Sequence, residues 1–66
     1  MEIVINGKPH HADAELSLAQ AVAVLTDAET GVAAAVNGDV VRRAVWEATQ
    51  LSDGDEVEVL TAVQGG

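Results

Sequence analysis

The residues of this chain that could do chemistry stand at its end, in the segment Thr61-Ala62-Val63-Gln64-Gly65-Gly66. Glycine has no Cβ and loses more conformational freedom on ordering than any other residue, so a Gly-Gly pair stabilises no regular element. A carboxylate at the end of so narrow an arm could enter a channel that no side chain on a folded surface reaches. We therefore interpret the Gly66 carboxylate as a reactive group. A frayed end or a cloning scar is the alternative.

Two other patterns could hold a metal ion. His10 and His11 are adjacent, but neighbouring residues on a strand point to opposite faces, and the sequence offers no third ligand of the kind that zinc requires. Asp53 and Asp55 flank a glycine without the further oxygen ligands of a calcium loop. The sequence therefore predicts edge-strand histidines and a turn, and no metal site.

Composition restricts the partners. The chain has 66 residues and a net charge of −8, from eleven acidic and three basic side chains. Nucleic acids and anionic membranes attract clustered Lys and Arg, so we expect neither as a partner. An acidic surface suits solubility or steered docking onto a basic partner. Cysteine is absent, which excludes a thiol nucleophile and disulfides. No apolar run reaches the length of a membrane span and no signal peptide is visible, so we expect a cytoplasmic protein.

The first half of the chain predicts a hairpin and a helix. Residues 2–5 are a β-branched run that ends in Asn6-Gly7, a dipeptide typical of type I′ hairpins. The return segment, residues 8–14, contains Pro9, which cannot donate to a ladder and indicates an edge strand. A Ser-x-x-Gln capping box then starts a helix of about ten residues that fades near residues 27–29. Its apolar stripe is Leu18, Ala21, Val22 and Leu25.

The middle of the chain predicts a second hairpin. Residues 32–36 are almost all apolar, which favours a central strand buried on both faces. Asn37-Gly38 is the next hairpin signal and leads into Val40-Val41. Residues 42–49 have no clear period. Trp46 within them is interpreted as a core or rim plug on a short helical turn, with an interface anchor as the alternative.

The last strand leads into the tail. Residues 51–55 indicate a turn in which Gly54 suits a left-handed position. Glu56-Val57-Glu58-Val59 alternates as expected for a strand with one wet face. Continuing the alternation puts Leu60 and Ala62 on the glutamate face, exposed where a partner would grip the protein. A shift of one residue in register would invert this assignment.

Together these elements predict one α+β domain over residues 1–66, a mixed sheet with one helix packed across one face. The first and last strands are expected to lie parallel at the centre of the sheet. The last strand would then project a flexible Gly-Gly tail from a rigid support.

This arrangement resembles the β-grasp, ubiquitin-like fold. More narrowly, the chain resembles the ThiS family of thiamine-biosynthesis sulfur carrier proteins. The residues that carry this likeness are Val36-Asn37-Gly38-Asp39-Val40-Val41, Arg43, Trp46, Leu51, Gly54-Asp55-Glu56-Val57-Glu58-Val59 and the tail from Thr61 to Gly66. One departure is Arg42, where the resemblance leads us to expect proline.

The resemblance implies a carrier that catalyses nothing alone and binds no cofactor. A ThiF-type adenylating enzyme would use ATP and magnesium to convert the Gly66 carboxylate to an acyl-adenylate. Sulfur from a cysteine desulfurase or another persulfide donor would then give a thiocarboxylate, and a ThiG-type thiazole synthase would receive the sulfur. Gly65 and Gln64 would lie in the partner's channel, with Val63, Ala62 and Leu60 as contacts at its mouth.

Four alternatives stay open. The small subunit of molybdopterin synthase has the same fold and tail chemistry, but it is typically longer and has a proline-containing approach to its tail. A sulfur carrier for cysteine synthesis would differ only in its acceptor. A protein modifier would join Gly66 to lysines through isopeptide bonds. A plain interaction domain would carry an inert tail.

Overall fold

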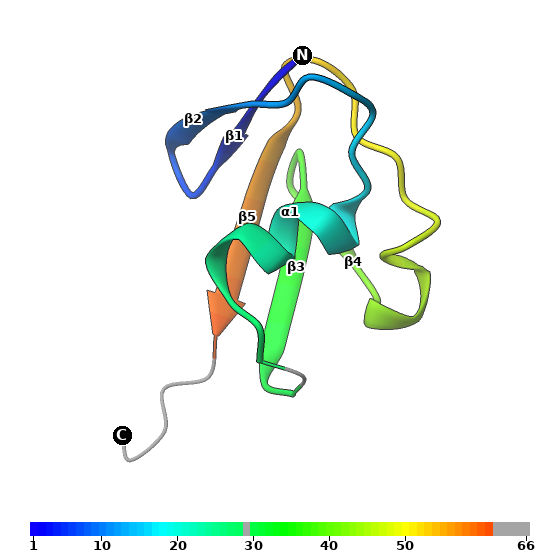
Figure 1. The fold of residues 1–66 in the computed structure, drawn as a ribbon. Helices are drawn as coiled ribbons and strands as arrows, with labels where there is room; N and C mark the ends of the chain where they lie inside the picture. The colour runs from blue at the N-terminus through cyan, green and yellow to red at the C-terminus, as the bar shows by residue number, and fades with distance from the viewer. Residues whose placement is uncertain (29, 62–66) are drawn as a thin grey trace.

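The computed structural model describes residues 1–28 and 30–61. Their elements, in chain order, are β1 (Glu2–Ile5), β2 (Lys8–His11), α1 (Leu18–Leu25), β3 (Val32–Val36), β4 (Asp39–Val41), the 3₁₀ turn η1 (Arg43–Val45) and β5 (Glu56–Thr61). The strands form one sheet in the order β2-β1-β5-β3-β4, and α1 lies across one of its faces (Figure 1). Within the described ranges no helix has the length and apolar character needed to cross a membrane.

Both Asn-Gly dipeptides close hairpins. Asn6 and Gly7 have φ values of 52° and 81°, and Asn37 and Gly38 have 51° and 89°, the left-handed backbone that a type I′ turn requires. The turns join β1 to β2 and β3 to β4 in antiparallel pairs. The two predicted hairpins are therefore confirmed. The edge position of β2 is confirmed too, although β2 ends at His11 and does not continue to residue 14.

The capping box of α1 is formed as predicted. The Gln20 N–H donates to Ser17 Oγ at 3.1 Å, and the Ser17 N–H donates to Gln20 Oε1 at 2.9 Å. The helix ends sooner than expected because Thr26 has an extended backbone, with φ of −154°. Its hydroxyl accepts from the Ala28 N–H at 3.0 Å, a local turn that competes with continued helix.

The core lies between α1 and one face of the sheet. Its buried residues are Ile3, Ile5, Leu18, Ala21, Val22, Ala34, Trp46, Leu51, Val57 and Val59. Two predictions about burial are wrong. Leu25 shares the helix face of Leu18 but is 44% exposed, at the last residue of α1. In β3 only Ala34 is buried and Ala33 is exposed, because the described chain covers only one face of the sheet.

The central strand of the sheet is β5. It runs parallel to β1, with Val4 beside Glu56 and Ile5 beside Val57, and antiparallel to β3. This confirms the prediction that the first and last strands lie parallel at the centre. The described part of β5 ends at the opposite end of the sheet from the N-terminus (Figure 1).

Candidate functional site at the end of strand β5

The predicted site residues fall into two groups. Gly66, Gly65, Gln64, Val63 and Ala62 lie outside the described residues. Leu60 lies on β5, and its side chain is 72% exposed. The structure therefore describes the strand that leads to the predicted tail and the surface beside that strand.

Side chains on β5 alternate between the core and the open face of the sheet. Val57 and Val59 are 1% and 5% exposed, whereas Glu56, Glu58 and Leu60 are exposed. The expected register is confirmed, because a shift of one residue would have buried the glutamates. Leu60 thus stands on the face that α1 does not cover.

Apolar groups surround Leu60 on this open face. Ala33 of β3 lies directly beside Leu60 in the ladder, and Ala35 beside Val40 of β4. Val40 is 79% exposed. A shallow groove of about 180 Å³ is lined by Ala33, Ala34, Ala35, Gly38, Val40, Glu58 and Leu60. Leu60, Ala33 and Val40 are thus exposed apolar side chains on the open face.

Carboxylates also stand on the open face. Glu56 and Glu58 lie beside Leu60 on β5, and Glu2 of β1 is also exposed. Successive side chains of β1 point to opposite faces of the sheet. Ile3 and Ile5 are buried against the core, so Glu2 points to the open face. The face therefore offers an apolar patch bordered by carboxylates, which suits a partner surface with apolar and basic groups.

Two asparagine side chains form hydrogen bonds with the backbone of β5, one near the middle of the strand and one at its start. The Asn6 Nδ2 donates to the Val59 carbonyl at 3.1 Å, and the Val59 N–H donates to Asn6 Oδ1 at 2.8 Å. At the start of the strand, the Glu56 N–H donates to Asn37 Oδ1 at 2.9 Å. From the sequence, both asparagines are predicted only as turn residues. Their dipeptides mark the turns, but nothing local indicates that the amides reach β5.

Trp46 is a core residue, as predicted. Its side chain is 5% exposed, and its Nε1 donates to the Val41 carbonyl at 2.8 Å. The guanidinium carbon of Arg43 lies 5.1 Å from the centroid of the indole ring, within the range of a cation–π contact. Because so little of Trp46 is exposed, the interface-anchor alternative has no support.

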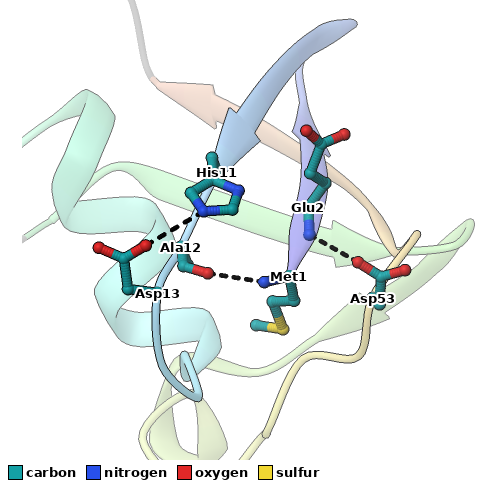
Figure 2. A network of polar contacts seen from close by, with 6 residues as sticks. All are labelled: Met1, Glu2, His11, Ala12, Asp13 and Asp53. Atoms are coloured by element: carbon teal, nitrogen blue, oxygen red, sulfur yellow. Dashed lines mark hydrogen bonds and ion pairs between the residues drawn. The ribbon is translucent and has the colours of Figure 1, made fainter.

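The residues considered as metal ligands serve other contacts. The partner of His10 in the ladder is buried Ile3, and that of His11 is exposed Glu2, so the two rings point to opposite faces. The His11 Nε2 instead lies 3.1 Å from Asp13 Oδ1, and Asp53 Oδ1 accepts from the Glu2 N–H at 2.6 Å (Figure 2).

Asp55 has a similar structural role. Its Oδ2 accepts from the Ser52 N–H at 2.7 Å and its Oδ1 from Asn37 Nδ2 at 3.1 Å, which is the chemistry of a turn. Gly54 between the aspartates has φ of 88°, as predicted. Within residues 1–28 and 30–61, no group of three or more acidic, histidine or cysteine side chains could hold a metal ion.

Comparison with known proteins identifies the family. A model of the ThiS family matches residues 3–66. The chain belongs to the ThiS family. A crystal structure of the thiamine biosynthesis protein ThiS from Geobacter metallireducens is similar to the whole chain, with 35% identity, a TM-score of 0.77 and complete coverage of both chains. The predicted β-grasp fold and the predicted family are thereby confirmed.

Two further similar proteins extend the comparison. A solution structure of a thiamine biosynthesis protein from Geobacter metallireducens is 35% identical with a TM-score of 0.79, and the match covers 100% of this chain and 88% of that one. A thiazole synthase from Magnetococcus marinus is 36% identical over 66 residues. This match covers 100% of the present chain and 20% of the relative, so the chain spans about a fifth of the relative's length.

Proposed function

We propose that this protein is a sulfur carrier for the synthesis of the thiazole ring of thiamine. The observation that supports this most is the ThiS-family match over residues 3–66, which includes the Gly-Gly segment. In this proposal Gly66 carries the donor group, and strand β5 presents it. The protein is then a co-substrate of other enzymes and has no catalytic activity alone.

The chemistry begins with activation of the Gly66 carboxylate. A carboxylate is a poor acyl donor because oxide leaves badly. A ThiF-type adenylating enzyme with ATP and magnesium joins a carboxylate oxygen to the α-phosphorus and releases pyrophosphate. The product is an acyl-adenylate, from which AMP leaves readily.

Sulfur then replaces AMP. The terminal sulfur of a persulfide, formed by a cysteine desulfurase or another donor, attacks the acyl carbon and expels AMP. A second thiol cleaves the resulting S–S bond, forms a disulfide with the donor and leaves a thiocarboxylate on Gly66. The chain has no cysteine, so no thiol of its own competes for the activated acyl group.

The open face of the sheet supplies the docking surface in this proposal. Leu60, Val40 and Ala33 provide apolar contacts, and Glu58 beside them meets a basic group of the partner. Gly65 and Gln64 enter the partner's channel, and Val63 and Ala62 contact its mouth. A partner that holds this face therefore also receives the tail.

A ThiG-type thiazole synthase is the proposed sulfur acceptor. The similarity of the whole chain to part of a thiazole synthase from Magnetococcus marinus supports this choice. Molybdopterin synthase and a cysteine-forming enzyme are the other acceptors that thiocarboxylate chemistry allows. Adding each acceptor to the thiocarboxylated protein and measuring the loss of sulfur distinguishes them.

The decisive experiment is an intact-mass measurement. We expect the protein, incubated with ATP, magnesium, the cognate adenylating enzyme and a persulfide donor, to gain the mass of one sulfur and lose that of one oxygen. Fragmentation should place the change on Gly66. The same measurement on the untreated native protein shows whether Gly66 ends in a free carboxylate, which the proposal requires.

Two controls make the result interpretable. A variant without Gly65 and Gly66 should keep its circular dichroism spectrum and gain no sulfur. Isopeptide conjugates to lysine in cells, in place of a free thiocarboxylate, would support a protein modifier. An unchanged mass with an enzyme shown to be active on another carrier would overturn the proposal.

A further inference from the structure

Strand β5 reaches further than one of its two neighbours. On the β3 side, pairing continues to the end of the described strand, where Thr61 lies beside Val32. On the β1 side, strand pairing stops at Ile5 and Val57, because the chain turns at Asn6-Gly7. Figure 1 shows β5 continuing past the β1–β2 turn with β3 still beside it.

The Asn6 side chain extends the ladder beyond the end of β1. The Asn6 backbone N–H donates to the Val57 carbonyl at 2.9 Å. Two residues further along β5, the Asn6 side chain bonds to both backbone groups of Val59. Its Nδ2 donates to the Val59 carbonyl at 3.1 Å, and its Oδ1 accepts from the Val59 N–H at 2.8 Å. A carboxamide presents an N–H donor beside a C=O acceptor, as the backbone of a strand does, so it replaces the missing strand residue.

This contact lies between the core and the segment proposed to donate sulfur. Val59 is the last buried side chain of the described part of β5, and Leu60 and Thr61 are exposed. Among the described residues, the Asn6 amide is the last group on the β1 side that pairs with the backbone of β5. The direction in which the chain continues from β5 therefore depends on β3 and on this one amide.

We infer that Asn6 is a positioning residue for the donor tail. Its amide keeps β5 extended through Thr61, and it thereby sets the point and the direction from which residues 62–66 enter the partner's channel. This inference rests on the proposed function. It assigns Asn6 no contact with the adenylate or the sulfur, and its effect reaches Gly66 through the backbone of β5.

Asn37 offers a matched control. It occupies the same position of the second Asn-Gly turn with nearly the same φ, 51° against 52° for Asn6. Its amide bonds to Glu56 and Asp55, at the start of β5. Glycine accepts a positive φ, so Asn6→Gly and Asn37→Gly each preserve a turn and remove one amide.

The test compares kcat/KM for sulfur transfer to these two variants. Both are incubated with ATP, magnesium, the cognate adenylating enzyme and a persulfide donor, at a temperature where both are fully folded. Because a misplacement of about 1 Å can cost about a hundredfold in rate, we expect Asn6→Gly to lower kcat/KM about tenfold or more. Asn37→Gly should stay within about twofold of the parent protein.

Hydrogen exchange supplies a readout that does not depend on sulfur transfer. In Asn6→Gly the Val59 amide should exchange faster while the Val57 amide keeps its protection. Asn6→Asp provides a second variant, because it keeps an acceptor for the Val59 N–H and loses the donor to the Val59 carbonyl. We expect its kcat/KM to be lower than that of the parent protein.

The outcomes separate the inference from the proposed function. Equal rates for Asn6→Gly and Asn37→Gly, or unchanged protection of Val59, would overturn the positioning role while sulfur transfer by the parent protein still stands. A parent protein that gains no sulfur would overturn the proposed function instead.

Discussion

At the scale of single residues, Arg42 is the departure that the family resemblance singled out. Its backbone has φ of −68° and ψ of 143°, close to the φ near −65° to which proline is restricted. Val41 before it lies in a strand, the conformation that a residue preceding proline prefers. The arginine therefore occupies a backbone site that is already suited to proline.

We predict that Arg42→Pro stabilises the protein by about 0.4–1 kcal/mol, because proline reduces the conformational entropy of the unfolded chain. Among the described residues, the Arg42 N–H makes no backbone hydrogen bond that proline would remove. Urea unfolding of Arg42→Pro beside Arg42→Ala separates the proline effect from the loss of charge. A lower midpoint for Arg42→Pro than for Arg42→Ala would contradict the prediction.

At the scale of elements, α1 is short and depends on its first turn. It has eight residues, and isolated helices of that length are marginal in water. Three of its residues, Leu18, Ala21 and Val22, are buried against the sheet. The capping box at Ser17 fixes where this buried stripe begins, and the Thr26 turn ends the helix at Leu25.

We predict that Ser17→Ala lowers the free energy of unfolding by about 1 kcal/mol, because the Gln20 N–H loses its acceptor. For a domain of this size that corresponds to a fall in Tm of roughly 4–8 °C. Thermal unfolding followed by circular dichroism measures it. Ser52→Ala, at an exposed turn position, is the control, and an equal effect of the two substitutions would argue against the cap.

At the scale of the whole molecule, the two faces of the sheet have different roles. One face is covered by α1 and holds the core, including Trp46. The open face carries Leu60, Val40 and the glutamates of β5. In the proposed function the open face contacts the partner enzyme, while the covered face holds β5 in place. Substitutions on the open face should therefore weaken partner binding, whereas substitutions in the core should lower stability.

We predict that Leu60→Ser raises KM for the adenylating enzyme about tenfold, a loss of about 1.4 kcal/mol, while stability changes by less than about 0.5 kcal/mol. Val24→Ser is the matched control, because Val24 is 57% exposed but lies on α1, away from the open face. Steady-state adenylation kinetics and urea unfolding of both variants check the prediction. Equal KM values for the two variants would contradict a contact between Leu60 and the adenylating enzyme.

Features set by neighbouring residues could be predicted from the sequence. The two Asn-Gly turns follow from which residues tolerate positive φ, and the start of α1 follows from a side chain that reaches a backbone group three residues away. The alternation of β5 placed Leu60 on the exposed face because strand periodicity is a property of the backbone. The tail residues 62–66 were singled out by the sequence alone and lie outside the described structure.

Features that join distant segments were decided by the tertiary structure. Burial of β3 on one face only, and the exposure of Leu25, depend on where a single helix lies across the sheet. The Asn6 amide reaches Val59, 53 residues away along the chain, and the same dipeptide would form its turn without that contact. Turn formation depends on local sterics, whereas a hydrogen bond across the sheet requires β1 and β5 to pack in one register, and the pattern of neighbouring residues does not encode it.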